Sequence, residues 1–127
     1  MTVRRITPSN LARGLGAAGH GVGHWAAQRT SAIALVPLAL WLVVALRSGA
    51  AADHAALTIW LGSPLNAMLM VLLLIAAFYH AALGLRVVAE DYIHSRARFL
   101  AVVLIQLACI AGATVGVVAV LLITSTS

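Results

Sequence analysis

Three long apolar runs constrain this chain more than any other feature of its sequence. They cover about 25–47, 64–89 and 99–123. A helix that crosses the hydrocarbon core of a bilayer needs about 20 predominantly apolar residues, and each run is long enough. Of the 127 residues, 63% are hydrophobic and 9% are charged, and a soluble domain of this size cannot bury so much apolar surface. The sequence therefore predicts an all-α integral membrane protein with three transmembrane helices.

Residues typical of helix ends border these runs. Ser63 precedes Pro64 at the start of the second run, as a capping hydroxyl precedes a proline in the first helical turn. Gly49 follows the first run, where a helix would end, and Ser95 could cap the third helix. Pro37 lies inside the first run, where we expect it to bend the helix because it lacks a backbone N–H.

The positive residues are all arginines, and they are divided unequally between the two sides of the predicted helices. Only Arg47 lies on one side, and seven lie on the other: Arg4, Arg5, Arg13, Arg29, Arg86, Arg96 and Arg98. Because basic residues collect on the cytoplasmic side, we expect a cytoplasmic amino terminus and a periplasmic carboxyl terminus. The formal net charge of +5 is therefore a topology signal, and no nucleic acid is expected as a partner.

The whole chain, 1–127, is predicted to be one membrane-anchor domain. We interpret 1–24 as a cytoplasmic extension that forms helix poorly until about His24, because several glycines precede that residue. The single cysteine, Cys109, lies inside the third run, so neither an intramolecular disulfide nor a cysteine metal cluster is expected. A small buried hydrophobic residue is the simpler interpretation of Cys109.

Tryptophans and glycines give weaker indications of packing. Trp25 and Trp60 lie near opposite ends of the runs, as interfacial anchors do, whereas Trp41 lies deeper and is expected to serve packing. Gly112 and Gly116 form a small-xxx-small pair, a weak signal for close helix approach.

His80 is the most unusual residue of the second run, because the apolar stretch from Leu65 to Leu85 surrounds it. An ionisable side chain at that depth is costly and is a candidate functional residue. A neutral imidazole in a water-poor pocket suits an axial ligand of haem iron, whereas zinc would need three or four ligands together. The alternative is a histidine that hydrogen-bonds to a neighbouring helix, and its position alone does not decide between them. A second histidine ligand would have to come from another chain.

The second predicted helix carries two distinct polar faces. One narrow stripe contains the histidine and the residues one, two and three turns further on: His80, Gly84, Val87 and Asp91. Gly84 lacks the side chain that would block a flat ligand beside the histidine. Arg86 and Glu90 lie away from this stripe and are spaced to form an ion pair.

Two further polar positions near the ends of the runs are candidates for binding. Tyr92, with Asp91 beside it, could donate to a quinone carbonyl at the wet end of a helix, where protons are available. A tyrosine of the interfacial belt is the alternative. Arg29 starts the first run, where its guanidinium could neutralise a haem propionate or simply extend to the lipid headgroups.

Two segments carry a resemblance to a known family. His24 to Leu35, HWAAQRTSAIAL, and His80 to His94, HAALGLRVVAEDYIH, resemble the small cytochrome b membrane-anchor subunit of succinate dehydrogenase, respiratory complex II. The first segment is similar to the family's Arg-x-x-Ala-Ile at the start of helix one. The second is similar to its helix-two pattern of a haem histidine, a glycine one turn on, and then Asp-Tyr at the membrane edge.

The resemblance implies specific roles for these residues. His80 would be one axial ligand of haem b, and the larger cytochrome b subunit would supply the other. Tyr92, supported by Asp91, would hydrogen-bond ubiquinone at the cytoplasmic side, and Arg29 would lie near the haem propionates. The role of His24 stays open.

The resemblance also implies partners in a bacterial inner membrane. A flavoprotein subunit and an iron–sulfur subunit would carry out succinate oxidation on the cytoplasmic face, since this chain has neither a dinucleotide fingerprint nor a cysteine cluster. The chain would anchor them and help pass electrons from the tricarboxylic acid cycle to ubiquinone. Whether three such heterotetramers associate stays open.

Two other functions remain open from the sequence. One is a fumarate reductase anchor that uses menaquinone, since both quinones offer carbonyl acceptors. The other is a structural membrane subunit, or a small transport subunit, without a cofactor. A transporter would usually place a carboxylate near the middle of the bilayer, but Asp53, Glu90 and Asp91 all lie near the ends of the runs.

Overall fold

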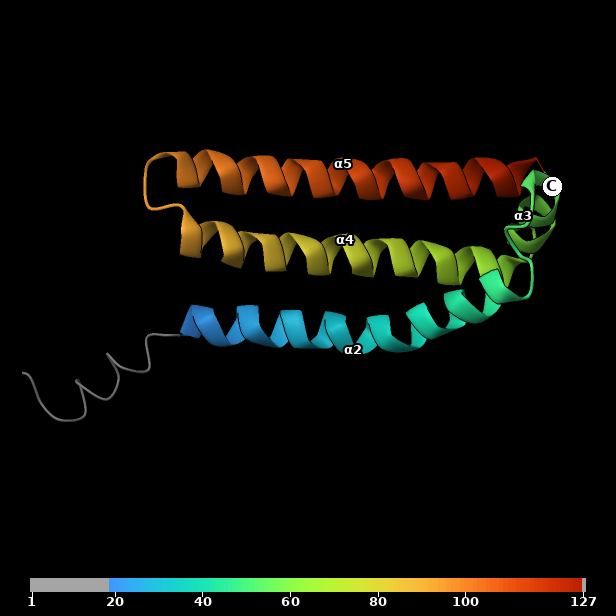
Figure 1. The fold of residues 1–127 in the computed structure, drawn as a ribbon, viewed down its shortest axis with the longest axis horizontal. Coiled ribbons are helices and arrows are strands. Elements are labelled where there is room, and N and C mark those ends of the chain that lie inside the picture. Colours follow the sequence, from blue (N-terminus) through green and yellow to red (C-terminus); the bar gives the residue numbers. More distant parts are fainter. Residues whose placement is uncertain (1–18, 127) are drawn as a thin grey trace, which may run out of the picture.

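The computed structural model describes residues 19–126. In this part of the chain, three long helices, α2 (Gly19–Arg47), α4 (Pro64–Tyr92) and α5 (Ala97–Ser125), run side by side with α4 in the middle (Figure 1). A short helix, α3 (His54–Leu61), lies across the end where α2 leads into α4. The long helices are apolar and long enough to cross a membrane, which confirms the predicted all-α fold with three spans.

The first helix begins earlier than the sequence predicted. α2 starts at Gly19, so Gly21, Gly23 and His24 are helical, whereas the sequence predicted poor helix formation until about His24. A glycine costs a helix roughly 1 kcal/mol, but an unpaired backbone N–H beside lipid costs several kcal/mol, and hydrogen bonding within the helix avoids that larger cost. The remainder of the predicted extension, 1–18, lies outside the described residues.

The end of α2 has the conformation expected of its glycine. Gly49 has a φ of 91°, a value that residues with a Cβ rarely adopt. Its N–H donates to the Leu46 carbonyl at 3.2 Å, and the Ala50 N–H donates to the Ala45 carbonyl at 3.0 Å. These two bonds form a Schellman motif, which satisfies carbonyls that the end of the helix would otherwise leave unpaired. Upstream, α2 continues through Pro37 without a break and follows a bent course, as expected (Figure 1).

The two predicted serine caps are only partly correct. Ser63 does occupy the capping position before Pro64, but its hydroxyl makes no capping hydrogen bond. The Ser95 hydroxyl accepts from the Ala97 N–H at 3.3 Å, although Arg96 stands at the capping position of α5. Pro64 lacks a backbone N–H and leaves the first turn of α4 one donor fewer, but the donors that a capping hydroxyl serves belong to the next two residues, so the proline does not explain the missing bond.

The short helix α3 was not predicted from the sequence. Asp53 caps it by accepting from the Ala56 N–H at 2.8 Å. An Asp before an apolar stretch is a sequence signal for the start of a helix. Trp60 of α3 stacks on Trp41 of α2, with ring centroids 5.2 Å apart. Trp60 therefore packs the short helix on α2 and is not only an interfacial anchor. Trp41 serves packing, as expected.

The glycines of α5 receive large side chains of α4. A Cβ at Gly112 would lie 2.5 Å from Cε1 of Phe78, and a Cβ at Gly116 would lie 3.1 Å from Cδ1 of Leu74. A Cβ at Gly112 would clash with Phe78, and one at Gly116 would be tight against Leu74, so the small-xxx-small pair does permit close approach of the two helices. Cys109, on the same helix, is buried, in agreement with its predicted packing role.

Candidate functional site

His80 lies in α4 on the side that faces α2, and it is partly buried. Its Nδ1 lies 3.0 Å from the hydroxyl oxygen of Ser31 on α2. Ser31 is 7% exposed, and its hydroxyl also donates to the backbone carbonyl of Gln28 at 2.9 Å. One ring nitrogen of His80 therefore bonds to a neighbouring helix, as the alternative interpretation of this histidine expected. Within residues 19–126, Nε2 makes no hydrogen bond and remains available to a ligand.

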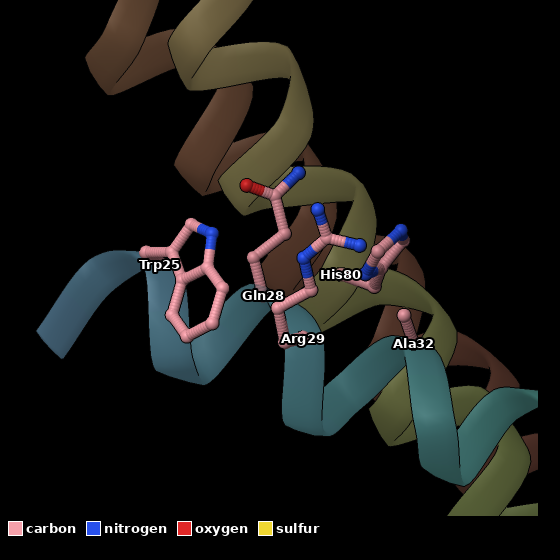
Figure 2. A pocket seen from close by; sticks show the side chains of 5 residues that line it. All are labelled: Trp25, Gln28, Arg29, Ala32 and His80. Carbon is pink, nitrogen blue, oxygen red and sulfur yellow. The ribbon is translucent and has the colours of Figure 1, made fainter. Parts of the chain in front are cut away.

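A recess of about 300 Å³ lies beside this histidine, between α2 and α4. Its walls are formed by four residues of α2 and one of α4: Trp25, Gln28, Arg29, Ala32 and His80 (Figure 2). Arg29 and His80 are far apart in the sequence, yet the packing of α2 on α4 brings both to the same recess. Two residues that the sequence singled out separately therefore belong to one site.

Arg29 is exposed, and an aromatic ring restrains its charged end. The guanidinium carbon lies 5.6 Å from the ring centroid of Trp25, one turn earlier on α2. This is a cation–π distance, and such a contact contributes about 0.5–1 kcal/mol at an exposed site. The cation is thus held at the edge of the recess and, among residues 19–126, has no carboxylate partner. An arginine in that position can bind an anionic group that enters the recess.

His80, Gly84 and Val87 of the predicted stripe face α2. A Cβ at Gly84 would lie 3.8 Å from the amide nitrogen of Gln28, an ordinary contact distance, so Gln28 of α2 lies over the glycine. Gly84 thus lies against α2. The sequence predicted that this glycine would leave one side of His80 open for a flat ligand, but Gln28 partly covers that side.

A second cleft, of about 430 Å³, adjoins the recess. It is lined by residues of α2 and α4: Gly21, His24, Trp25, Gln28, Arg86, Val87 and Glu90. Arg86 and Glu90 form the predicted ion pair, with an N–O distance of 2.8 Å, and both side chains are over 40% exposed. His24 has a buried Nε2 that no group among residues 19–126 satisfies. His24 therefore faces α4 and the cleft, a placement that its position before the first predicted helix did not indicate.

Asp91 and Tyr92 stand apart from the recess. Tyr92 is the last residue of α4 and is 82% exposed, and Asp91 is exposed beside it. At a rise of 1.5 Å per residue, Tyr92 lies about 18 Å along α4 from His80. No hydrogen bond or ion pair within residues 19–126 involves either side chain. The structure therefore does not bring the two pairs of predicted site residues together.

The donors of the recess limit what it can bind. Among residues 19–126 there is no group of three or more His, Cys, Asp or Glu side chains that could hold a metal ion. The recess offers one imidazole nitrogen as a metal ligand and one guanidinium as a cation, beside the Gln28 amide and the Trp25 indole. That pair fits a ligand that carries its own metal and also has an anionic group, which is the chemistry of a haem with its iron and propionates.

Two polar residues near Arg29 in the sequence belong to this site although they were not among the predicted ones. Gln28 and Ser31 precede and follow Arg29, and both contact α4 through their side chains. Polar residues at the start of an apolar run are readily taken for an ordinary interfacial boundary. Their spacing to Arg29 was visible in the sequence, but only the packing of α2 on α4 shows that they face His80.

Comparison with known proteins agrees with this architecture. The family described as succinate dehydrogenase/fumarate reductase transmembrane subunit matches residues 3–123. The chain belongs to this family. No solved structure matches it.

Several bacterial relatives carry the name succinate dehydrogenase hydrophobic membrane anchor subunit. That of Rickettsia conorii is 34% identical over 101 residues, which cover 78% of this chain and 80% of the relative. That of Rickettsia bellii is 40% identical over 83 residues, or 65% of this chain and 66% of the relative. That of Paracoccus denitrificans is 30% identical over 101 residues, or 80% of this chain and 78% of the relative.

The family and the three apolar helices together locate the chain. It is a membrane anchor subunit of succinate dehydrogenase and a multi-pass protein of the bacterial inner membrane. The predicted resemblance to this family is thereby confirmed. The cytoplasmic position of the amino terminus stays a prediction from the arginine distribution.

Proposed function

We propose that this anchor subunit shares a haem b with the larger cytochrome b subunit and forms part of the ubiquinone-reduction site. The observation that carries the proposal is the recess in which His80 and Arg29 meet. Its imidazole and guanidinium match the two kinds of polar group that a haem presents, and its other walls are Trp25, Gln28 and Ala32.

A haem bound here would supply a one-electron carrier within the membrane. His80 would provide one axial nitrogen through Nε2, and Arg29 would neutralise a propionate. The recess is on the surface of the helix bundle, and residues 19–126 supply one histidine to it, so a partner chain would have to cover the other face of the haem and add the second ligand. The larger cytochrome b subunit is the partner that family membership favours.

Tyr92 and Asp91 are the proposed contacts to ubiquinone. Tyr92 is exposed at the end of a membrane helix, so its phenol is free to donate a hydrogen bond to a quinone carbonyl. Asp91 beside it is the proposed supporting residue, and both stand at the end of a membrane helix, where the protons that quinone reduction consumes are available. An iron–sulfur subunit and a flavoprotein subunit on the same side would deliver the electrons of succinate oxidation.

The haem assignment is tested with His80→Ala in the complete complex. We expect the b-type haem spectrum to be lost or strongly altered, because alanine removes the axial nitrogen. Optical spectra of the oxidised and dithionite-reduced complex, with haem content per flavin, measure this. His94→Ala is the matched control, since His94 is an exposed histidine in the turn after α4. A reduced spectrum unchanged by His80→Ala would refute the ligand assignment.

The quinone assignment is tested with Tyr92→Phe. Phenylalanine keeps the ring but removes the hydroxyl, so assembly and haem content should persist while quinone reduction slows by roughly tenfold, the effect of about 1.4 kcal/mol. Steady-state quinone reduction is compared with reduction of a soluble acceptor that bypasses the membrane. Tyr79→Phe, on the same helix, controls for loss of a phenol. Wild-type quinone kinetics in Tyr92→Phe would count against the role.

Menaquinone, which the sequence left open together with a fumarate reductase anchor, is the second candidate acceptor, because the family description covers both enzymes. The three relatives compared above all carry the succinate dehydrogenase name, which favours that enzyme over a fumarate reductase. Extraction and identification of the quinone that co-purifies with the complex distinguishes the two.

A further inference from the structure

The side chain of Ser31 contacts two polar groups at once. Its hydroxyl oxygen lies 2.9 Å from the Gln28 carbonyl oxygen and 3.0 Å from Nδ1 of His80. Ser31 is the buried polar residue of the described chain, at 7% exposure, so little water can reach these contacts. A polar group in such surroundings is costly unless each short contact is a hydrogen bond.

The positions of the protons follow from the number of donors. The serine hydroxyl has one proton, the Gln28 carbonyl can only accept, and Nδ1 of a neutral imidazole can either donate or accept. If the hydroxyl donated to Nδ1, two oxygens would face each other at 2.9 Å with no proton between them, which is repulsive. Both contacts are satisfied when Ser31 donates to Gln28 and the Nδ1–H of His80 donates to Ser31.

The direction of the first bond is set within α2 itself. Gln28 is three residues before Ser31 on the same helix, and a serine hydroxyl readily bonds a carbonyl of the preceding turn. Ser31 therefore presents only its lone pairs to α4. His80 has to bring the proton for the contact between the two helices.

We propose that Ser31 is a positioning residue that holds the proton of His80 on Nδ1 and so presents a bare Nε2 to the haem iron. This inference rests on the proposed haem site. A metal-bound histidine commonly donates its other N–H to a neighbouring acceptor, which fixes the tautomer and the ring orientation and raises the basicity of the ligand. Ser31 is the group on this chain that supplies that acceptor.

Ser31→Ala in the complete complex tests the proposal. Alanine removes the acceptor, so His80 becomes a weaker electron donor and its ring is free to turn. We expect haem transfer to apomyoglobin to become about 10 to 100 times faster, the usual cost of losing such a partner. The haem midpoint potential should move to more positive values, because a weaker donor stabilises the ferric state less.

Two variants make the result specific. Ser31→Thr keeps a hydroxyl that can bond the preceding turn and should restore both the potential and haem retention. Thr30→Ala removes the adjacent hydroxyl, which is exposed and makes no hydrogen bond within residues 19–126, and should change neither. If Ser31→Ala does not assemble, Ser31→Cys, which keeps a weak acceptor, should move the potential in the same direction.

Three results would overturn the role of Ser31. An unchanged potential and unchanged haem retention in Ser31→Ala would mean that the contact only packs α2 on α4, whatever happens to thermal stability. Tighter haem binding in Ser31→Ala would mean that the serine donates to Nδ1 and hinders the ligand. Failure of Ser31→Thr to restore the potential would assign the effect to side-chain size. In each case, haem loss in His80→Ala would still support the proposed function.

Discussion

Helix α4 has two neighbours, and its contacts with them differ in kind. Toward α5 it places Phe78 and Leu74 against Gly112 and Gly116, where an added methyl group would clash at Gly112 and be tight at Gly116. Toward α2 it places His80 beside Ser31, and the two helices enclose recesses lined by polar side chains.

The two contacts follow from residues that are almost adjacent in the sequence. Phe78 and His80 are two positions apart, which is about 200° on a helical wheel, so they lie on opposite sides of α4. The close contact with α5 fixes the position of α4 through shape alone. The contact with α2 can then leave room for a ligand, because α5 already holds α4 in place.

We expect the largest difference in stability between the two faces of α4 when one glycine at each face is replaced by alanine. Gly112→Ala would place a Cβ 2.5 Å from the Phe78 ring, whereas Gly84→Ala would meet Gln28 at 3.8 Å. Both changes replace a helical glycine by alanine, so the gain in helix propensity cancels between them. We expect Gly112→Ala to be less stable than Gly84→Ala by about 1–3 kcal/mol, the usual cost of overpacking.

Thermal unfolding of the purified complex, followed by loss of helical circular dichroism, measures this difference. The haem spectrum should stay b-type in both variants, because neither glycine supplies a ligand. Equal melting temperatures for the two variants would show that α4 packs no more closely on α5 than on α2.

We expect a smaller effect, on haem retention, from Arg29, the cation at the edge of the recess between α2 and α4. Arg29→Gln removes the charge at the edge of the recess but keeps hydrogen-bonding ability, so haem should be retained less well. We expect transfer of haem to apomyoglobin to be about tenfold faster, which corresponds to ~1.4 kcal/mol. Arg47→Gln is the matched control, because it removes an exposed arginine at the opposite end of the same helix. Equal haem transfer in the two variants would remove Arg29 from the site.

The smallest effect is expected from the ion pair of α4. Glu90→Gln breaks the bridge to Arg86, whose side chain is exposed, as is that of Glu90. Such a pair within one helix contributes about 0.3–0.5 kcal/mol, so the melting temperature of the complex should change by little more than the error of the measurement. A large loss of stability would mean that these charges hold the α2 face together, and that its polar contacts carry as much stability as the glycine packing toward α5.

Several features of the fold were readable from the residues. The apolar runs predicted the three long helices, Gly49 predicted the end of α2, and Gly112 and Gly116 predicted a close helix contact. Each of these depends on local composition or spacing. Helix α3 was missed because its eight residues are too short for periodicity to stand out, although Asp53 marked its start.

The site was only partly predictable. His80, Arg29, Asp91 and Tyr92 stood out because polar groups are costly in or near a membrane, and the structure brings the first two to one recess. Ser31 and Gln28 did not stand out, because a polar residue near the start of a membrane helix is ordinary.

The sequence by itself determined that this protein spans a membrane three times, and it identified a histidine that needs a polar partner there. Lipid cannot bond backbone or imidazole groups, so long apolar helices and an isolated histidine are informative without any knowledge of packing. Only the tertiary structure decided that Ser31 takes one nitrogen of His80 and leaves the other available. That choice depends on how α2 is rotated and shifted against α4, which is set by contacts between residues far apart in the chain.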